Sequence, residues 1–157
     1  MNTEQVTLII EAMNAEMADT RKRFQEKMQS VFKDAFKSYF EQNPEVTAVI
    51  WRQYTPYFND GDACVFRCYA GYAAHTNAPD PENVQWGEYN GENEGVWVYD
   101  PDYGSSGDVP KKVETAADQF NRLLNKIEDD VFLSTFGDHC IVRATRDGFD
   151  VDEYDHD

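Results

Sequence analysis

The sequence has few positive charges. Its 14 Lys and Arg residues stand against 30 Asp and Glu residues, so the formal net charge at pH 7 is −16. Binding to the phosphates of DNA, RNA or anionic lipid requires clustered Lys and Arg, so we expect neither direct nucleic-acid binding nor membrane attachment. Residues 71–110 contain eight acidic residues and no Lys or Arg at all. An acidic field attracts basic molecules, which makes a protein with a basic surface the expected partner.

Long apolar runs and paired cysteines are also missing. No uninterrupted stretch approaches the roughly 18 apolar residues that a membrane-spanning helix requires. The first residues lack the basic flank and apolar segment of a secretion signal. Three cysteines are present, an odd number in a chain without an export signal, and this favours reduced thiols. We therefore expect a cytoplasmic protein.

Familiar catalytic motifs are absent too. The sequence contains no glycine-rich phosphate loop, no G-x-S-x-G elbow and no H-E-x-x-H helix, and we expect no cofactor. Asn59, Asp60 and Asp62 crowd one turn and form a weak candidate for a divalent-cation site, although they do not follow the spacing of a calcium loop. Two alternatives to a protein-binding function stay open. One is a small-ligand or divalent-cation-binding protein, and the other is an enzyme without familiar motifs.

The first 43 residues predict one long amphipathic helix, from Thr3 to Gln42, which Asn43-Pro44 ends. Its apolar residues are mostly three or four positions apart and share one face: Val6, Ile10, Met13, Met17, Phe24, Met28, Val31, Ala35 and Tyr39. Forty residues at 1.5 Å each span roughly 60 Å, which exceeds what a domain of this size needs. We expect the stripe to pack on the core. The alternatives are a break near Thr20 or a projecting helix that pairs with a partner helix, such as that of a second copy in a homodimer.

The remaining sequence predicts an α+β fold in a single domain of residues 1–157. A period of two and an Asp-Gly turn predict a hairpin over 46–70, and 96–100 predicts a third short strand. A second helix is expected over 109–136, followed by a C-terminal hairpin. The order α-βββ-α-ββ implies an antiparallel sheet of about five strands with the long N-terminal helix and the second helix packed on one face.

Between the hairpin and the third strand, residues 71–95 predict a long surface loop that is both acidic and aromatic. Carboxylates interleaved with Tyr and Trp suit an interface with a basic partner, because Tyr and Trp are common interface anchors. The alternative is that the aromatic residues only cover the sheet and the acids only confer solubility. The candidate partner-binding residues are Glu82, Trp86, Glu88, Tyr89, Glu92, Glu94, Asp100 and Asp102.

Two segments carry a resemblance to a known family. W-R-Q-Y-T-P-Y-F-N-D-G-D at residues 51–62 and T-R-D-G-F-D-V-D-E-Y-D-H-D at 145–157 resemble a family of small, mostly uncharacterised proteins of tailed bacteriophages. The resemblance implies a setting, the cytoplasm of an infected host cell, rather than an activity. Small acidic phage proteins often bind a host or defence protein. The sequence thus suggests a phage accessory protein that acts by protein–protein binding, as an acidic inhibitor of such a partner.

Overall fold

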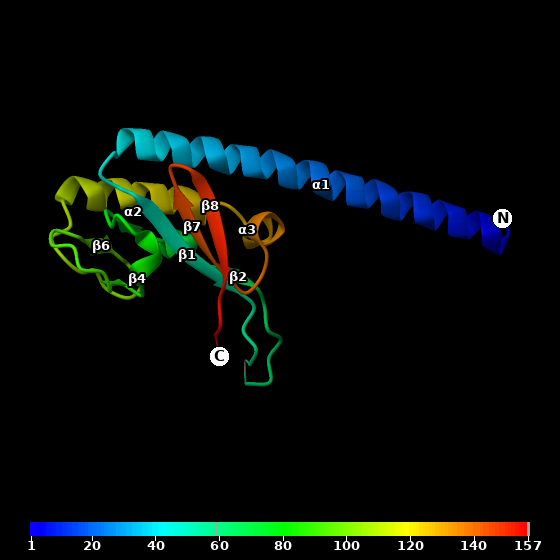
Figure 1. The fold of residues 1–157 in the computed structure, drawn as a ribbon. Helices are drawn as coiled ribbons and strands as arrows, with labels where there is room; N and C mark the ends of the chain where they lie inside the picture. The colour runs from blue at the N-terminus through cyan, green and yellow to red at the C-terminus, as the bar shows by residue number, and fades with distance from the viewer. Residues whose placement is uncertain (59, 157) are drawn as a thin grey trace.

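The computed structural model describes residues 1–58 and 60–156, and it confirms the expected α+β class (Figure 1). The helices are α1 (Thr3–Gln42), α2 (Lys111–Asn125) and α3 (Asp129–Phe136), with short 3-10 turns η1 (Ala70–Tyr72) and η2 (Pro81–Asn83). The strands are β1 (Ala48–Tyr54), β2 (Arg67–Cys68), β3 (Ala74–Thr76), β4 (Val84–Gln85), β5 (Glu88–Tyr89), β6 (Val98–Tyr99), β7 (Cys140–Thr145) and β8 (Gly148–Glu153).

The main sheet is antiparallel and has the order β6-β3-β1-β7-β8, with β2 also paired to β1. The short strands β4 and β5 form a separate hairpin. Because side chains alternate along a strand, the central strand β1 turns Val49, Trp51 and Gln53 to one face and Ile50 and Arg52 to the other. The first set is buried more completely, and its face of the sheet is the one that packs in the core.

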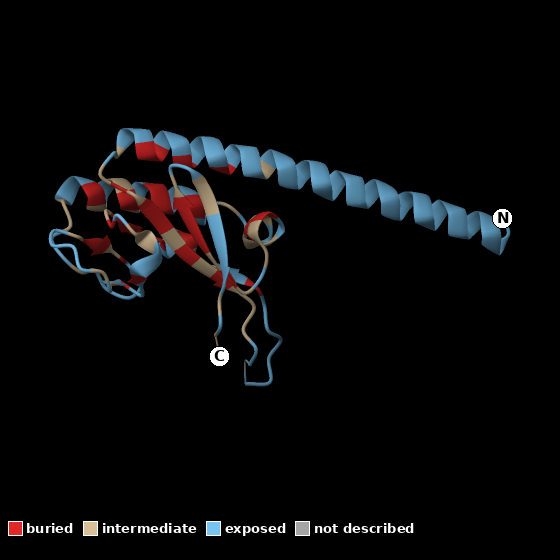
Figure 2. Cartoon of the chain, in the orientation of Figure 1, coloured by how far each residue is buried: buried red, intermediate tan, exposed pale blue. Residues whose placement is uncertain are grey.

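The core lies between the first face of the sheet and the three helices (Figure 2). Phe36 of α1 stacks on Trp51 with ring centroids 5.8 Å apart, and Phe32 contacts Phe132 of α3 at 5.3 Å. The buried amide of Gln53 donates to the backbone oxygens of Phe132 at 3.0 Å and Gly137 at 2.7 Å. These bonds fasten α3 to the sheet, because buried polar groups are costly without partners.

A buried histidine joins two helices to the sheet. The side chain of His75, in β3, is within 2.8 Å of both the Tyr39 hydroxyl of α1 and Oδ1 of Asn121 in α2. The Asn121 amide nitrogen donates to the backbone oxygen of Ala73, so its Oδ1 must accept from His75. The neutral imidazole therefore carries its proton on Nε2 and accepts from Tyr39 at Nδ1.

Three expectations about these elements need correction. The predicted helix over 109–136 is two helices, because the chain turns at residues 126–128 and extends at Glu128, which lets α3 pack against α1. The hairpin over 46–70 forms, but only two residue pairs join β1 and β2. The segment 71–95 is not simply a surface loop. It contains β3, β4 and β5, because a run of small residues and His75 pairs with the edge of β1 and is buried there.

Candidate functional site

The N-terminal part of α1 extends well beyond the rest of the molecule (Figure 1). Every residue from 1 to 27 is exposed, and Figure 2 shows this part of the helix in pale blue along its whole length. Asn2 caps the helix through a capping box with Gln5. Gln25 then donates from its amide to the backbone oxygen of Ser134 in α3. The helix is continuous from Thr3 to Gln42, so it does not break near Thr20, and its N-terminal part projects from the rest of the molecule.

The apolar stripe of this projection is not part of the core, which corrects the expectation that the stripe packs there. Its side chains are between 41% and 60% exposed: Val6, Ile10, Met13, Met17 and Phe24. The helix instead uses Phe32, Phe36, Tyr39 and Phe40 against the sheet. At 100° per residue, this second set lies about a quarter turn around the helix from the stripe. Of the predicted stripe, Val31 and Ala35 are also exposed, Met28 is half-buried and only Tyr39 is buried.

The spacing of the stripe suits pairing with another helix. The positions 6, 10, 13, 17, 20 and 24 alternate steps of four and three, which is the a/d repeat of a coiled coil. Thr20 is the polar member. Residues 3–31 contain five acidic and four basic residues, a net charge of −1 in a chain of −16. The projection is thus nearly neutral, and its apolar face is open.

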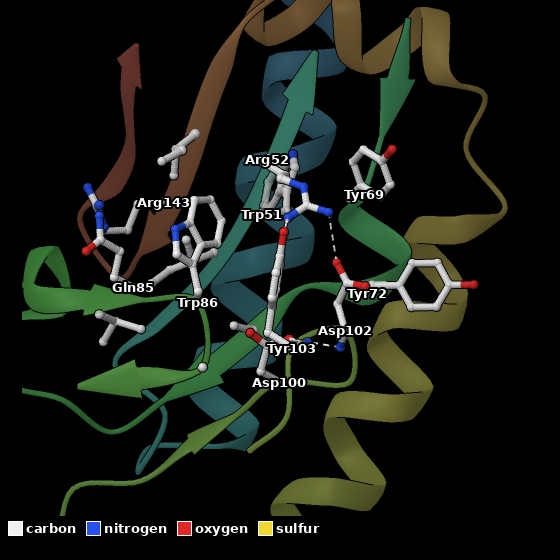
Figure 3. Close-up of a pocket in the computed structure, with 15 residues that line it drawn as sticks. Trp51, Arg52, Tyr69, Tyr72, Gln85, Trp86, Asp100, Asp102, Tyr103 and Arg143 are labelled. Carbon is white, nitrogen blue, oxygen red and sulfur yellow. Dashed lines mark hydrogen bonds and ion pairs between the residues drawn. The ribbon is translucent and has the colours of Figure 1, made fainter. Parts of the chain in front are cut away.

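A second feature lies on the other face of the sheet (Figure 3). Alternation along β1 and the register of β1 with β7, which pairs Ile50 with Arg143 and Arg52 with Ile141, bring these four side chains to one face. The β4–β5 hairpin and residues 100–105 lie over them. Together they enclose a pocket of about 50 Å³ whose further walls include Trp86 and Tyr103.

Arg52 is surrounded by aromatic rings. Its guanidinium carbon lies 4.6 Å from the ring centre of Tyr69, 4.7 Å from that of Tyr103 and 5.6 Å from that of Trp86. One terminal nitrogen is 3.1 Å from Oδ2 of Asp102, and the other donates to the Tyr103 hydroxyl. Cation–π attraction and the ion pair each offset part of the cost of burying this charge.

Arg143 is the second buried cation of the pocket. The residue is only 8% exposed, and its Nη1 is 3.0 Å from Oδ2 of Asp152 on β8. The Nε atoms of both Arg52 and Arg143 are buried and have no hydrogen-bond partner among the described residues. A buried donor without an acceptor is costly, so each of these two Nε groups lowers the stability of the fold.

The loop beneath the hairpin is held in shape by Asp100. One carboxylate oxygen, Oδ1, accepts from the backbone N–H groups of Asp102 and Tyr103, both at 2.9 Å. Burial raises the pKa of this carboxyl above its usual value. A side chain at Gly87 would lie 2.2 Å from the backbone oxygen of Gly104, so the hairpin and the loop are in direct contact.

Trp86 is presented to the pocket by a constrained turn. Trp86 and Gly87 join β4 to β5 and both have positive φ, 50° and 82°, as in a tight two-residue hairpin turn. Asparagine is the usual residue at the first of these positions, and a tryptophan there is conformationally costly. Its ring lies 5.2 Å from that of Tyr103, so the strained turn places an indole over the sheet.

The predicted partner-binding residues divide into two groups. Trp86, Asp100 and Asp102 meet at the pocket. The others belong to the hairpin and its flanks: Glu82, Glu88, Glu92 and Glu94 are exposed, and Tyr89 is half-buried with its hydroxyl bonded to Asp80. Sequence reasoning missed Arg52, Arg143 and Tyr103. The only available signal was a single arginine in each of two apolar strands, which alternation alone assigns to a solvent-exposed face.

The candidate cation site receives no support from the geometry. Asn59 lies outside the described residues, and Asp60 and Asp62 are exposed. Among residues 1–58 and 60–156, no three His, Cys, Asp or Glu side chains are arranged to hold a metal ion. Within the same residues, no helix combines the length and the apolar character needed to cross a membrane.

Scans against protein-family models, curated proteins and solved structures each gave no significant match to this chain. The two features that bear on function are therefore the projecting part of α1 and the arginine pocket, the pocket around Arg52 and Arg143.

Proposed function

We propose that the protein acts by protein–protein binding and that the exposed stripe of α1 pairs with the α1 helix of a second copy. The observation that carries the proposal is the stripe itself, five apolar side chains on one face of a helix that no other part of the described chain covers. Burying an exposed apolar side chain of this size stabilises a complex by about 1 kcal/mol or more. Ten such side chains in a dimer suffice to offset a cost of association of about 10 kcal/mol.

Charge favours a second copy of the chain, rather than an anionic membrane, as the surface that covers the stripe. The net charge of −1 over residues 3–31 lets two helices approach, whereas the charge of −16 on the whole chain opposes an anionic membrane. Glu16, Arg21 and Arg23 flank the stripe at the positions that face each other in a coiled coil. In a parallel pair Glu16 faces Arg21 of the second copy, and in an antiparallel pair centred between residues 18 and 19 it faces Arg23.

A dimer would present two acidic surfaces, one from each copy, to a basic partner. The exposed carboxylates of Glu82, Glu88, Glu92 and Glu94 gather on the β4–β5 hairpin and its flanks, in the part of the chain without Lys or Arg. The resemblance to tailed-bacteriophage proteins supports an infected bacterial cytoplasm as the setting and a host or defence protein as the target. Pairing raises the effective concentration of the second acidic face for a partner that is bound to the first.

Sedimentation equilibrium of the full chain tests the dimer. Met13→Glu with Met17→Glu introduces two charges into the stripe and is expected to shift the dimer to monomer. Leu8→Glu with Ala15→Glu is the matched control, because it adds the same charge on the opposite face of the same exposed helix. A wild-type protein that stays monomeric at about 100 μM, or a control pair that dissociates the dimer equally, would contradict the proposal.

A pull-down from bacterial lysate tests the acidic face. The wild-type protein is compared with a variant in which Glu82, Glu88, Glu92 and Glu94 are changed to Lys, at low and at high salt. We expect a protein with a basic surface to be enriched by the wild type, lost at high salt because screening weakens charge attraction, and absent with the variant. Equal recovery by both proteins would reject the acidic face as the binding surface.

A further inference from the structure

We infer that the two α1 helices pair antiparallel, so that the acidic first half of each helix lies along the basic second half of the other. The inference rests on the proposed pairing of α1, and it names the surface of the second copy that receives the stripe. It depends on three observations: the division of charge along α1, the exposure of the helix beside the core, and the charge of the rest of the chain.

The charge of α1 differs between its two halves. Residues 1–20 contain four acidic residues and no Lys or Arg, a net charge of −4, whereas residues 21–37 contain six basic and two acidic residues, a net charge of +4. In a parallel pair each segment lies beside its own copy, so that like charges meet. In an antiparallel pair the acidic segment of one copy lies beside the basic segment of the other, and the two attract each other.

The apolar stripe fits both orientations and does not decide between them, because a and d positions form the seam in either case. In the antiparallel pair centred between residues 18 and 19, Val6 lies opposite Val31 of the second copy. Val31 is 47% exposed, and Ala35 is exposed as well. The stripe face of α1 therefore stays open beside the core, and the second helix has room to extend along it.

The charge of the rest of the chain opposes a parallel pair. Residues 46–157 contain 22 acidic and 8 basic residues, a net charge of −14, and they lie against the C-terminal part of α1 (Figure 1). A parallel pair places the two acidic parts at the same end, with helix axes about 10 Å apart. In the antiparallel pair the two Met28 residues, where α1 begins to pack against the core, are roughly 30 Å apart along the axis. That is about three Debye lengths at physiological salt, so screening removes most of the repulsion.

The orientation also restricts the kind of basic partner. The acidic parts of the two copies then lie at opposite ends of the helix pair rather than side by side. A partner that contacts both copies must therefore be extended or carry repeated basic surfaces, because multivalent binding requires that the partner span both sites.

Distances between spin labels in the full-length protein test the orientation. Cys64 is replaced by Ser because its thiol is exposed, and a nitroxide is attached in Thr3→Cys, at the exposed start of α1. We expect the labels of the two copies to lie about 45 Å apart, the length of about 31 residues at 1.5 Å each. A parallel pair places them within about 25 Å of each other, and that result would overturn the inference.

A label in Ala18→Cys separates a wrong orientation from the absence of a dimer. Residue 18 lies beside the centre of the pair, so both orientations place its two labels within about 30 Å. A short distance at residue 18 with a long one at residue 3 supports the antiparallel pair. Short distances at both residues reject the orientation but retain the dimer. No measurable distance at either residue rejects the pairing of α1 itself.

Two charge reversals with the same change in net charge give an independent test. Glu16 faces Arg23 of the second copy in the antiparallel pair and Arg21 in a parallel pair. Arg23→Glu is therefore expected to raise the dissociation constant about tenfold in sedimentation equilibrium, because two attractive contacts become repulsive. Adding Glu16→Arg restores opposite charges and should recover the affinity. Arg21→Glu is the matched control and should raise the dissociation constant less than about threefold. An effect of Arg21→Glu as large as that of Arg23→Glu would contradict antiparallel pairing.

Discussion

Protonation of His75 is expected to destabilise this protein as the pH falls below about 6.5. The imidazole is completely buried between α1, β3 and α2, where it donates to Asn121 and accepts from Tyr39. A second proton would place a positive charge in a site with no exposure to water. Burial lowers the pKa of His75 from 6.5 to about 4, against smaller opposing effects of Asn121 and Asp118.

The size and sign of the effect follow from these two pKa values. Because the folded-state pKa is lower, the unfolded chain takes up the proton first, and stability that is fully present above pH 6.5 is lost as the pH falls toward 4. Each unit of pKa difference corresponds to 1.36 kcal/mol. At pH 5 the expected loss from His75 is therefore about 2 kcal/mol, and it approaches about 3 kcal/mol near pH 4.

Urea unfolding at pH 8 and pH 5 measures this loss, with His75→Gln as the reference. Glutamine cannot titrate in this range but has an amide donor and an acceptor. Thirty acidic residues also titrate toward low pH, and the comparison between the two proteins cancels their contribution. The wild type is expected to lose about 2 kcal/mol more than the variant between the two pH values. If the two proteins lost the same free energy, the buried neutral histidine would not be the source of the pH dependence.

Three further predictions concern the core, the pocket and the projection. Phe36→Ala should lower the free energy of unfolding by about 3–5 kcal/mol in urea titrations, because Phe36 is 2% exposed and packs against Trp51; a loss below 1 kcal/mol would contradict this packing. Gly87→Ala should lower the free energy of unfolding by about 1 kcal/mol or more in urea titrations, because alanine is strained at a φ of 82° and its added carbon collides with the backbone oxygen of Gly104; an unchanged free energy of unfolding would contradict a tight hairpin–loop contact. Deleting residues 1–23 should abolish self-association, measured by sedimentation, and change the unfolding free energy of the dissociated monomer by less than about 0.5 kcal/mol, because every deleted residue is exposed; a large loss of monomer stability would show a packing role for this segment.

Local signals in the sequence were sufficient for α1 and for the class of fold. The α1 helix covers Thr3–Gln42 as predicted, because its start is capped by Asn2 and its end is determined by Pro44, and both act within one turn of the chain. Gly137 ends α3 with a φ of 97°, a conformation that glycine adopts at little cost. The prediction failed where one helix was expected over 109–136, because apolar periodicity continues through the turn at residues 126–128.

The sequence predicted only some of the residues that line the pocket. Trp86, Asp100 and Asp102 were singled out for their residue types, and they do line the pocket. Arg52 and Arg143 were not singled out, although they supply the positive charges of the pocket. They are 91 positions apart along the chain, and their common environment depends on the register of β1 with β7 and on the hairpin that covers both.

By itself, the sequence determined where α1 begins and ends, that the chain after it combines strands with further helix, and that the protein is strongly acidic. These properties depend on backbone geometry, side-chain periodicity and charge, which neighbouring residues control. Only the tertiary structure decided which apolar face of α1 is covered, that His75 is buried, and that Arg52 and Arg143 lie under Trp86. Periodicity shows which residues share a face, but the burial of that face depends on what distant parts of the chain place against it.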